Sequence, residues 1–155
     1  MLSPRQIERD AAGGVRLRFA EEELFLLREL LAELEPLLED PDDPAVRRLF
    51  PPAHAEPENE EQYRSLVRDQ LVAGRAKALV TVRDTLGKEK LNAEEAEAWL
   101  RALNDLRLVL GTRLDVSEDV DWEEIDVQEP RGRDLAVYAY LSWLQEQLIE
   151  ALGER

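Results

Sequence analysis

The stretch 93–114, AEEAEAWLRALNDLRLVLGTRL, decides the fold because it has the longest clean helical period in the chain. Trp99, Leu103 and Leu106 recur at three- and four-residue spacing, which places them on one face of a helix. Asn92 precedes the stretch, and asparagine is a favoured helix N-cap. We therefore predict a helix here against which the other helices pack.

A second side of this helix is polar. Asn104, Arg107 and Gly111 align along it, while Arg101 and Asp105 lie one turn apart and are spaced to pair with each other. Such a row beside a tryptophan is either a ligand site or a buried polar network that fixes helix register. We favour the structural interpretation.

The remaining elements follow on both sides of this helix. Val15 and Leu17 alternate with arginines, as in a strand, whereas five prolines in residues 40–59 indicate a loop. The predicted elements are a hairpin within 5–19, a leucine-rich helix from Glu21 that Pro36 ends or kinks, a helix over 60–86 and a last helix capped by Asp134 and ending near Leu152. The predicted fold class is mainly α, a compact bundle of about four helices with a small N-terminal β-hairpin.

Composition sets limits on the function. The 155 residues fit a single domain over 1–155, and they contain no cysteine, which excludes thiolate metal sites and disulfides. The formal net charge of −15 repels nucleic-acid phosphates and anionic lipid, so we expect neither nucleic acid nor membrane as a partner. Without an apolar leader or a run of about 20 apolar residues, a cytoplasmic location is expected.

The last helix carries two aromatic residues beside its leucine stripe. Tyr140 and Trp143 point to a neighbouring side, and large aromatics in that position indicate a second buried surface. The surface is covered either by the hairpin or a loop of the same chain, or by a partner protein, including a second copy. Tyr140 and Trp143 are therefore the candidate partner-binding residues.

An acidic stretch over 115–129 holds eight acids and no base. Its oxygen-bearing side chains fall at the spacing of an EF-hand calcium loop, but Val120 occupies the position that requires glycine. We therefore predict an acidic surface loop with no metal and no cofactor. The weak alternative is a cation site made by Asp115, Asp119, Asp121 and Asp126.

A small-ligand site requires polar groups that converge between helices. No nucleophile with an attached base is visible in the sequence, and His54, the one histidine, lies in the proline-rich loop without a partner at metal-ligand spacing. Several arginines and a carboxylate, if they converge, are suited to hold an anionic ligand. This candidate set consists of Arg64, Arg75, Asn104, Asp105, Arg107 and Arg113.

Five segments together carry a resemblance to a known family. They are EEELFLL at 21–27, RRLFPPAH at 47–54, EQYRSLVRDQL at 61–71, WLRALNDLRLVLGTRLDV at 99–116 and VYAYLSWLQEQL at 137–148. In this order the chain resembles, from about residue 15 to 152, a family of unknown function found mainly in actinobacteria. Its most specific element is W-L-x-x-L-N-D-x-R-L-x-L-G-T-R-L. The resemblance implies genes that often lie beside that of the Clp-protease adaptor ClpS, and hence a link to protein turnover, but no catalytic residue.

The preferred function is therefore a non-catalytic protein-interaction module linked to regulated proteolysis. The alternative is a small anionic-ligand binder or an enzyme that uses the inter-helix Arg/Asn/Asp set. A transcriptional regulator is less favoured, because the most basic predicted helix, 60–86, lacks the clustered cationic and amide side chains of a recognition helix.

Overall fold

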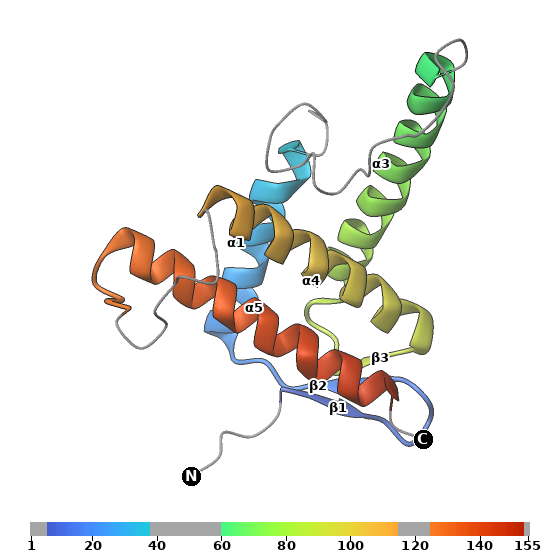
Figure 1. The fold of residues 1–155 in the computed structure, drawn as a ribbon. Coiled ribbons are helices and arrows are strands. Elements are labelled where there is room, and N and C mark those ends of the chain that lie inside the picture. Colours follow the sequence, from blue (N-terminus) through green and yellow to red (C-terminus); the bar gives the residue numbers. More distant parts are fainter. Residues whose placement is uncertain (1–5, 38–59, 115–124, 154–155) are drawn as a thin grey trace.

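The computed structural model describes the backbone of residues 6–37, 60–114 and 125–153, and their side chains except those of residues 60–69 and 71. Within these ranges it contains four helices and one small antiparallel sheet (Figure 1), which confirms the predicted fold class. In chain order the elements are β1 (Ile7–Arg9), β2 (Val15–Leu17), α1 (Glu21–Leu37), α3 (Glu60–Thr85), β3 (Lys90–Leu91), α4 (Ala93–Arg113) and α5 (Pro130–Gly153).

The N-terminal hairpin forms as predicted, but it belongs to a three-stranded sheet in the order β1-β2-β3. The turn between β1 and β2 is closed by the amide of Asp10, which donates to the carbonyl of Gly14 at 2.9 Å. Gly13 takes a positive φ of 102°, and an added Cβ on Gly14 would lie 1.9 Å from the carbonyl oxygen of Leu91 in β3. Both glycines of this turn are therefore required by geometry.

Helix α4 is central to the fold, since it contacts α1, α3 and α5 (Figure 1). It begins with a capping box in which the amide of Glu95 donates to Asn92 Oδ1 at 2.8 Å. The amide of Asn92 donates in return to Glu95 Oε1 at 3.0 Å. The cap satisfies two backbone donors that the start of a helix otherwise leaves unpaired. It confirms the predicted role of Asn92.

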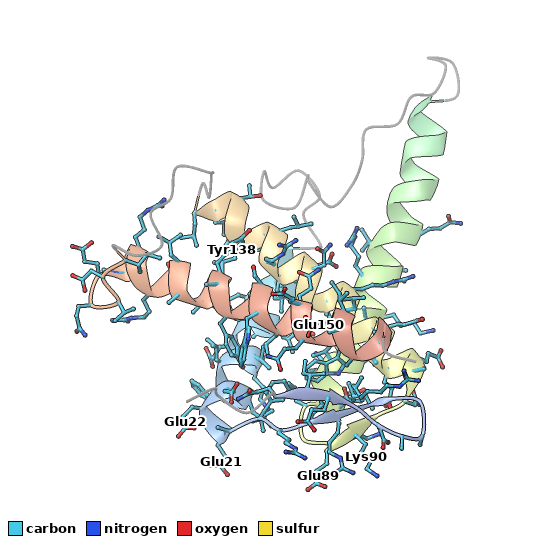
Figure 2. All side chains as sticks on the ribbon, turned by 60° about the horizontal axis from the view of Figure 1, so that its bottom comes forward. Glu21, Glu22, Glu89, Lys90, Tyr138 and Glu150 are labelled. Carbon is cyan, nitrogen blue, oxygen red and sulfur yellow. The ribbon has the colours of Figure 1, made fainter. Side chains whose placement is uncertain are left out.

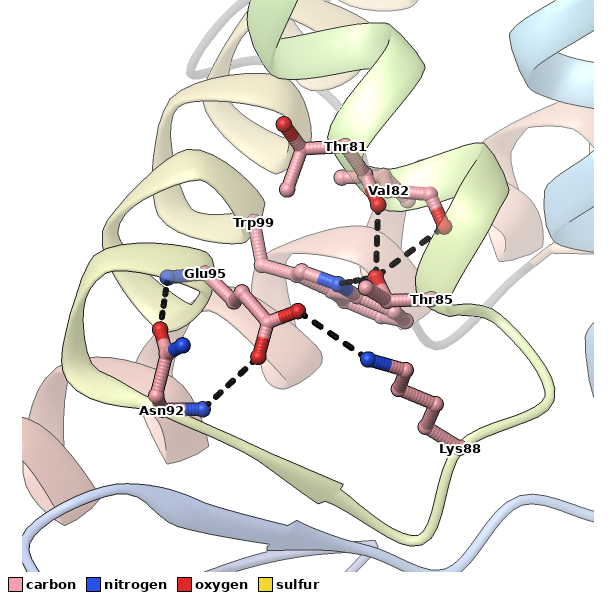
Figure 3. A network of polar contacts seen from close by, with 7 residues as sticks. All are labelled: Thr81, Val82, Thr85, Lys88, Asn92, Glu95 and Trp99. Carbon is pink, nitrogen blue, oxygen red and sulfur yellow. Dashed lines mark hydrogen bonds and ion pairs between the residues drawn. The ribbon is translucent and has the colours of Figure 1, made fainter.

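Trp99 joins three parts of the core and is completely buried. Its ring stacks on Phe19, with centroids 5.8 Å apart and planes 7° from parallel. Its indole Nε1 donates to Thr85 Oγ1 at 2.7 Å, and that hydroxyl donates to the carbonyl of Thr81 in α3, also at 2.7 Å (Figure 3). The only polar atom of the indole is thus satisfied inside the core, as a buried tryptophan requires.

Helix α5 begins earlier than predicted. Pro130 is its first residue, so the prediction that Asp134 caps this helix after a break is wrong. Proline is compatible with a first helical turn, where its missing amide hydrogen has no helical partner to lose. An added Cβ on Gly132 would lie 1.9 Å from the carbonyl oxygen of Asp126, which explains the glycine in this turn.

The sheet is joined to α5 by hydrogen bonds to Gln147 and by apolar packing. Gln147 is buried, and its Oε1 accepts hydrogen bonds from the backbone amides of Gln6 at 2.9 Å and Ile7 at 3.2 Å. The inner faces of the strands, through Ile7, Val15 and Leu17, join the same core as the predicted leucine stripe of α5. None of the helices within the described ranges is both long and apolar enough to cross a membrane.

Candidate functional site

The buried polar centre of the molecule is an ion pair between α3 and α4. Arg75 Nη1 donates to Asp105 Oδ1, and the Asp105 side chain is 1% exposed whereas that of Arg75 is 24% exposed. The predicted pairing of Asp105 with Arg101 is therefore wrong. The partner comes from the neighbouring helix, because Asp105 faces α3, and Arg101 acts on it only through the field of its charge.

Burial controls the electrostatics of this pair. Burial raises the pKa of Asp105 above its ordinary value, although the hydrogen bond and charge of Arg75 act in the opposite direction. Asp105 Oδ2 has no hydrogen-bond partner among the residues that the structure describes. A half-satisfied buried carboxylate costs free energy, which offsets part of what the ion pair contributes to stability.

The polar row predicted on α4 faces α5. Asn104 Oδ1 accepts from Arg107 Nη2 at 3.5 Å and from Gln145 Nε2 at 3.3 Å. An added Cβ on Gly111 would lie 2.9 Å from Cε2 of Tyr138, so the glycine lets the two helices approach closely. The row therefore makes an interhelical contact, as its structural interpretation predicted.

The six residues of the predicted ligand set do not form one cluster within the described structure. Arg75 meets Asp105, and Arg107 meets Asn104, on different sides of α4. Arg113 is exposed in the last turn of α4, and the side chain of Arg64 lies outside the described residues. Asp105 neutralises the charge of Arg75, which makes Arg75 less available to an anionic ligand. Binding of an anion by the whole set stays a prediction.

Two further predictions concern residues mostly outside the described ranges. Of the four aspartates of the weak cation alternative, Asp115, Asp119 and Asp121 are not described, and neither is His54. Asp126 is exposed, and its Oδ1 accepts the backbone amide of Gln128 at 2.9 Å in the turn before α5. Among the side chains that are described, no three potential metal ligands gather.

The aromatic pair of α5 is partly used by the chain itself. Tyr140 donates its hydroxyl to Glu23 Oε2 in α1, and burial together with this carboxylate raises the pKa of Tyr140 well above its ordinary range. Glu23 is fixed in turn, because its Oε1 accepts from Gln6 Nε2 and from the amide of Ala20, each at 3.1 Å. Trp143 lies 6.1 Å from the Tyr140 ring and is 37% exposed.

One further site was not anticipated from the sequence. A cavity of about 610 Å³ opens beside the sheet, between the start of α1 and the segment that joins α3 to β3. The residues that line it include the apolar Leu17, Phe19, Leu24 and Leu86, the cationic Arg16, Arg18, Lys88 and Lys90, and the acidic Glu89. We call this cavity the basic groove. The one sequence signal for it was the alternation of arginines with apolar residues in 15–19. The strand β3 is only two residues long, which is too short to show an alternating pattern.

Comparisons with known proteins place the chain in a family. The Oxidative stress regulator AosR of Mycobacterium tuberculosis is 30% identical over 130 residues, as is that of Mycobacterium bovis. A Mycobacterium leprae protein carrying the provisional form of this name is 32% identical over 131 residues. The alignments cover 72% of this chain but 59% of each relative, so the chain spans little more than half of their length.

No solved structure matches the chain. The family model described as Domain of unknown function (DUF2017) matches residues 5–152, nearly the whole chain. This match agrees with the resemblance to a family of unknown function, and it carries no information on neighbouring genes. The chain therefore belongs to the DUF2017 family.

Proposed function

We propose that this chain is a non-catalytic regulatory module that acts by binding another protein during the response to oxidants. The relatives named as oxidative stress regulators support the regulatory part of this proposal. The 155 residues contain no cysteine, so they offer no thiol that a peroxide can convert to a sulfenic acid or a disulfide. In this proposal, a thiol-based oxidant signal therefore reaches these residues from elsewhere.

The observation that carries the proposal is the state of Trp143. More than a third of its surface is exposed, while the adjacent Tyr140 is held in place by Glu23 of α1. An exposed tryptophan on a rigid helix loses little conformational entropy on binding, and tryptophan is among the residues most enriched at interface hot spots. Trp143 is therefore our candidate contact for a partner protein or a second copy of the chain.

Several narrower statements remain proposals. A link to Clp-dependent proteolysis is implied only by the family resemblance, and the names of the relatives do not support it. A cytoplasmic location and the absence of nucleic-acid partners rest on the sequence, in particular on the net charge of −15. The alternative of a small anionic ligand is less favoured, because the Asp105 carboxylate occupies Arg75.

The test is complementation of a strain of the source organism that lacks the gene. We expect altered survival after hydrogen peroxide in the deletion strain, restoration by the natural chain, and no restoration by Trp143→Ala. The matched control is Phe25→Ala, which removes an aromatic side chain that is 65% exposed on α1 and should restore survival.

Purified Trp143→Ala should still unfold in one cooperative urea transition, at a lower midpoint than the natural chain, because most of the tryptophan surface is covered and its ring lies beside Tyr140. The proposal is wrong if Trp143→Ala restores survival fully, or if deletion of the gene leaves survival after peroxide unchanged.

A further inference from the structure

The basic groove holds cations on a chain whose net charge is strongly negative. Arg16 and Lys90 face each other in the register of β2 and β3, on the outer side of the sheet. Neither takes part in an ion pair within the described ranges. Lys90 projects from the sheet on the side away from α5 (Figure 2). Like charges directly opposite each other on neighbouring strands reduce the stability of a sheet.

The other two cations of the groove are held weakly. Arg18 Nη2 lies 3.5 Å from Glu8 Oε2, and Lys88 Nζ lies 3.4 Å from Glu95 Oε2. The side chains of Arg18 and Lys88 are more than half exposed, so water screens both pairs and each contributes little to folding. Glu89 is the acidic residue among those that line the groove. Glu8 also faces Arg16 in the register of β1 and β2 and compensates part of its charge, so Lys90 is the rim cation whose charge is most available to a ligand.

The floor of the groove is apolar. Phe19 and Leu24 are half-buried and supply its accessible apolar surface, Phe19 is backed by the ring of Trp99, and Leu17 and Leu86 lie beneath them in the core. A volume of about 610 Å³ is sufficient for several amino-acid side chains. A ligand that uses both surfaces must carry negative charges together with apolar groups.

We propose that the basic groove binds an acidic peptide segment of a partner protein, with acidic side chains on the rim cations and at least one apolar side chain on the floor. The proposal rests on the proposed function, since it names the chemistry of the partner. Charge complementarity favours a peptide over nucleic acid. Glu21 and Glu22 are exposed at the start of α1, at the bottom of Figure 2 like Glu89 and Lys90. They repel a continuous phosphate backbone, whereas a peptide can place neutral residues beside them.

The probe is a short fluorescein-labelled peptide of alternating glutamate and leucine, titrated with the intact chain by fluorescence anisotropy. We expect saturable binding that weakens as salt is added. Charge reversal by Lys90→Glu or Arg16→Glu should weaken it by roughly tenfold or more, because each removes one rim contact and adds a repulsive one. Amide chemical shifts on titration should change around β2 and β3.

Arg133→Glu is the matched control, because it makes the same change of charge at an exposed position in the first turns of α5. It should change the affinity by about twofold or less, as expected for a distant charge screened by salt. Lys90→Glu should also raise the midpoint of thermal unfolding, because it replaces a like-charge pair across the strands by an opposite-charge pair. If Lys90→Glu loses peptide binding while its unfolding midpoint rises, the loss of binding is not caused by unfolding.

Four results would overturn the inference. They are equal binding of the glutamine version of the peptide, equal weakening by Arg133→Glu, tighter binding of a single-stranded DNA oligonucleotide that Lys90→Glu abolishes, and a salt-sensitive self-association that Lys90→Glu abolishes. Failure here is distinguishable from failure of the proposed function. Peptide binding is measured with purified protein at the groove, whereas the effect of Trp143→Ala is measured as survival in cells.

Discussion

Replacement of Thr85 by valine tests how the buried tryptophan holds α3 to α4. The two side chains are nearly equal in shape, but valine cannot accept the hydrogen bond that Trp99 Nε1 now donates at 2.7 Å. The indole N–H would remain buried without a partner, because both residues are almost fully shielded from water. An unsatisfied buried donor costs about 1–3 kcal/mol. For a chain of this size, about 2 kcal/mol corresponds to a fall in Tm of roughly 4–8 °C.

The assay is urea denaturation followed by far-ultraviolet circular dichroism, run as a double-mutant cycle with Trp99→Phe. Phenylalanine has no N–H to satisfy, so Thr85→Val should cost less in that background, by about 1 kcal/mol or more. Equal costs in the two backgrounds would refute the reasoning. They would mean that the hydroxyl of Thr85 acts through its hydrogen bond to the carbonyl of Thr81 alone.

Other substitutions test separate parts of the structure. Asp105→Asn should flatten the pH dependence of the free energy of unfolding. Burial raises the pKa of Asp105, so the stability that this group contributes is fully present below the ordinary pKa of an aspartate. That contribution is lost as the pH rises through the raised pKa. Urea titrations of both proteins across acidic pH check this, and unchanged slopes would contradict it. Gly132→Ala should destabilise by about 2 kcal/mol or more, because the new Cβ meets a backbone carbonyl, whereas Gly74→Ala in α3 has open space and should stabilise by about 0.5–1 kcal/mol. Thermal unfolding of the two variants should shift in opposite directions. Lys90→Glu should stabilise the sheet by about 0.2–1 kcal/mol in urea denaturation, and a loss of stability would show that the facing cations do not repel.

The helices were predictable because their apolar residues repeat over many turns. The stripe around Trp99 and Leu103 and the cap at Asn92 depend only on residues close in sequence. The beginning of α5 was not predictable, because proline and glycine usually interrupt helices. The structure shows that Pro130 occupies the first turn and that Gly132 leaves room for the carbonyl of Asp126.

The candidate sites were less predictable, for a physical reason. Pairing of Asp105 was assigned to the nearest cation along the helix, but burial turned the carboxylate towards Arg75, which is 30 residues away in sequence. The basic groove combines residues 16–24 with residues 86–90, which are far apart in the sequence. The strand Lys90–Leu91 is only two residues long, so it has no sequence pattern that could predict it. Pairing between distant segments depends on the packed core, which a local pattern does not describe.

The hydrogen bonds that Gln147 accepts have a consequence for how the chain folds during its synthesis on the ribosome. They join residues that are 140 and 141 positions apart, so the first strand has its anchor only after almost all of α5 has been synthesised. An isolated hairpin of this length is marginally stable in water. The nascent N-terminal segment therefore lacks this anchor while α1, α3 and α4 emerge, and it gains the anchor only after Gln147 has left the ribosomal tunnel.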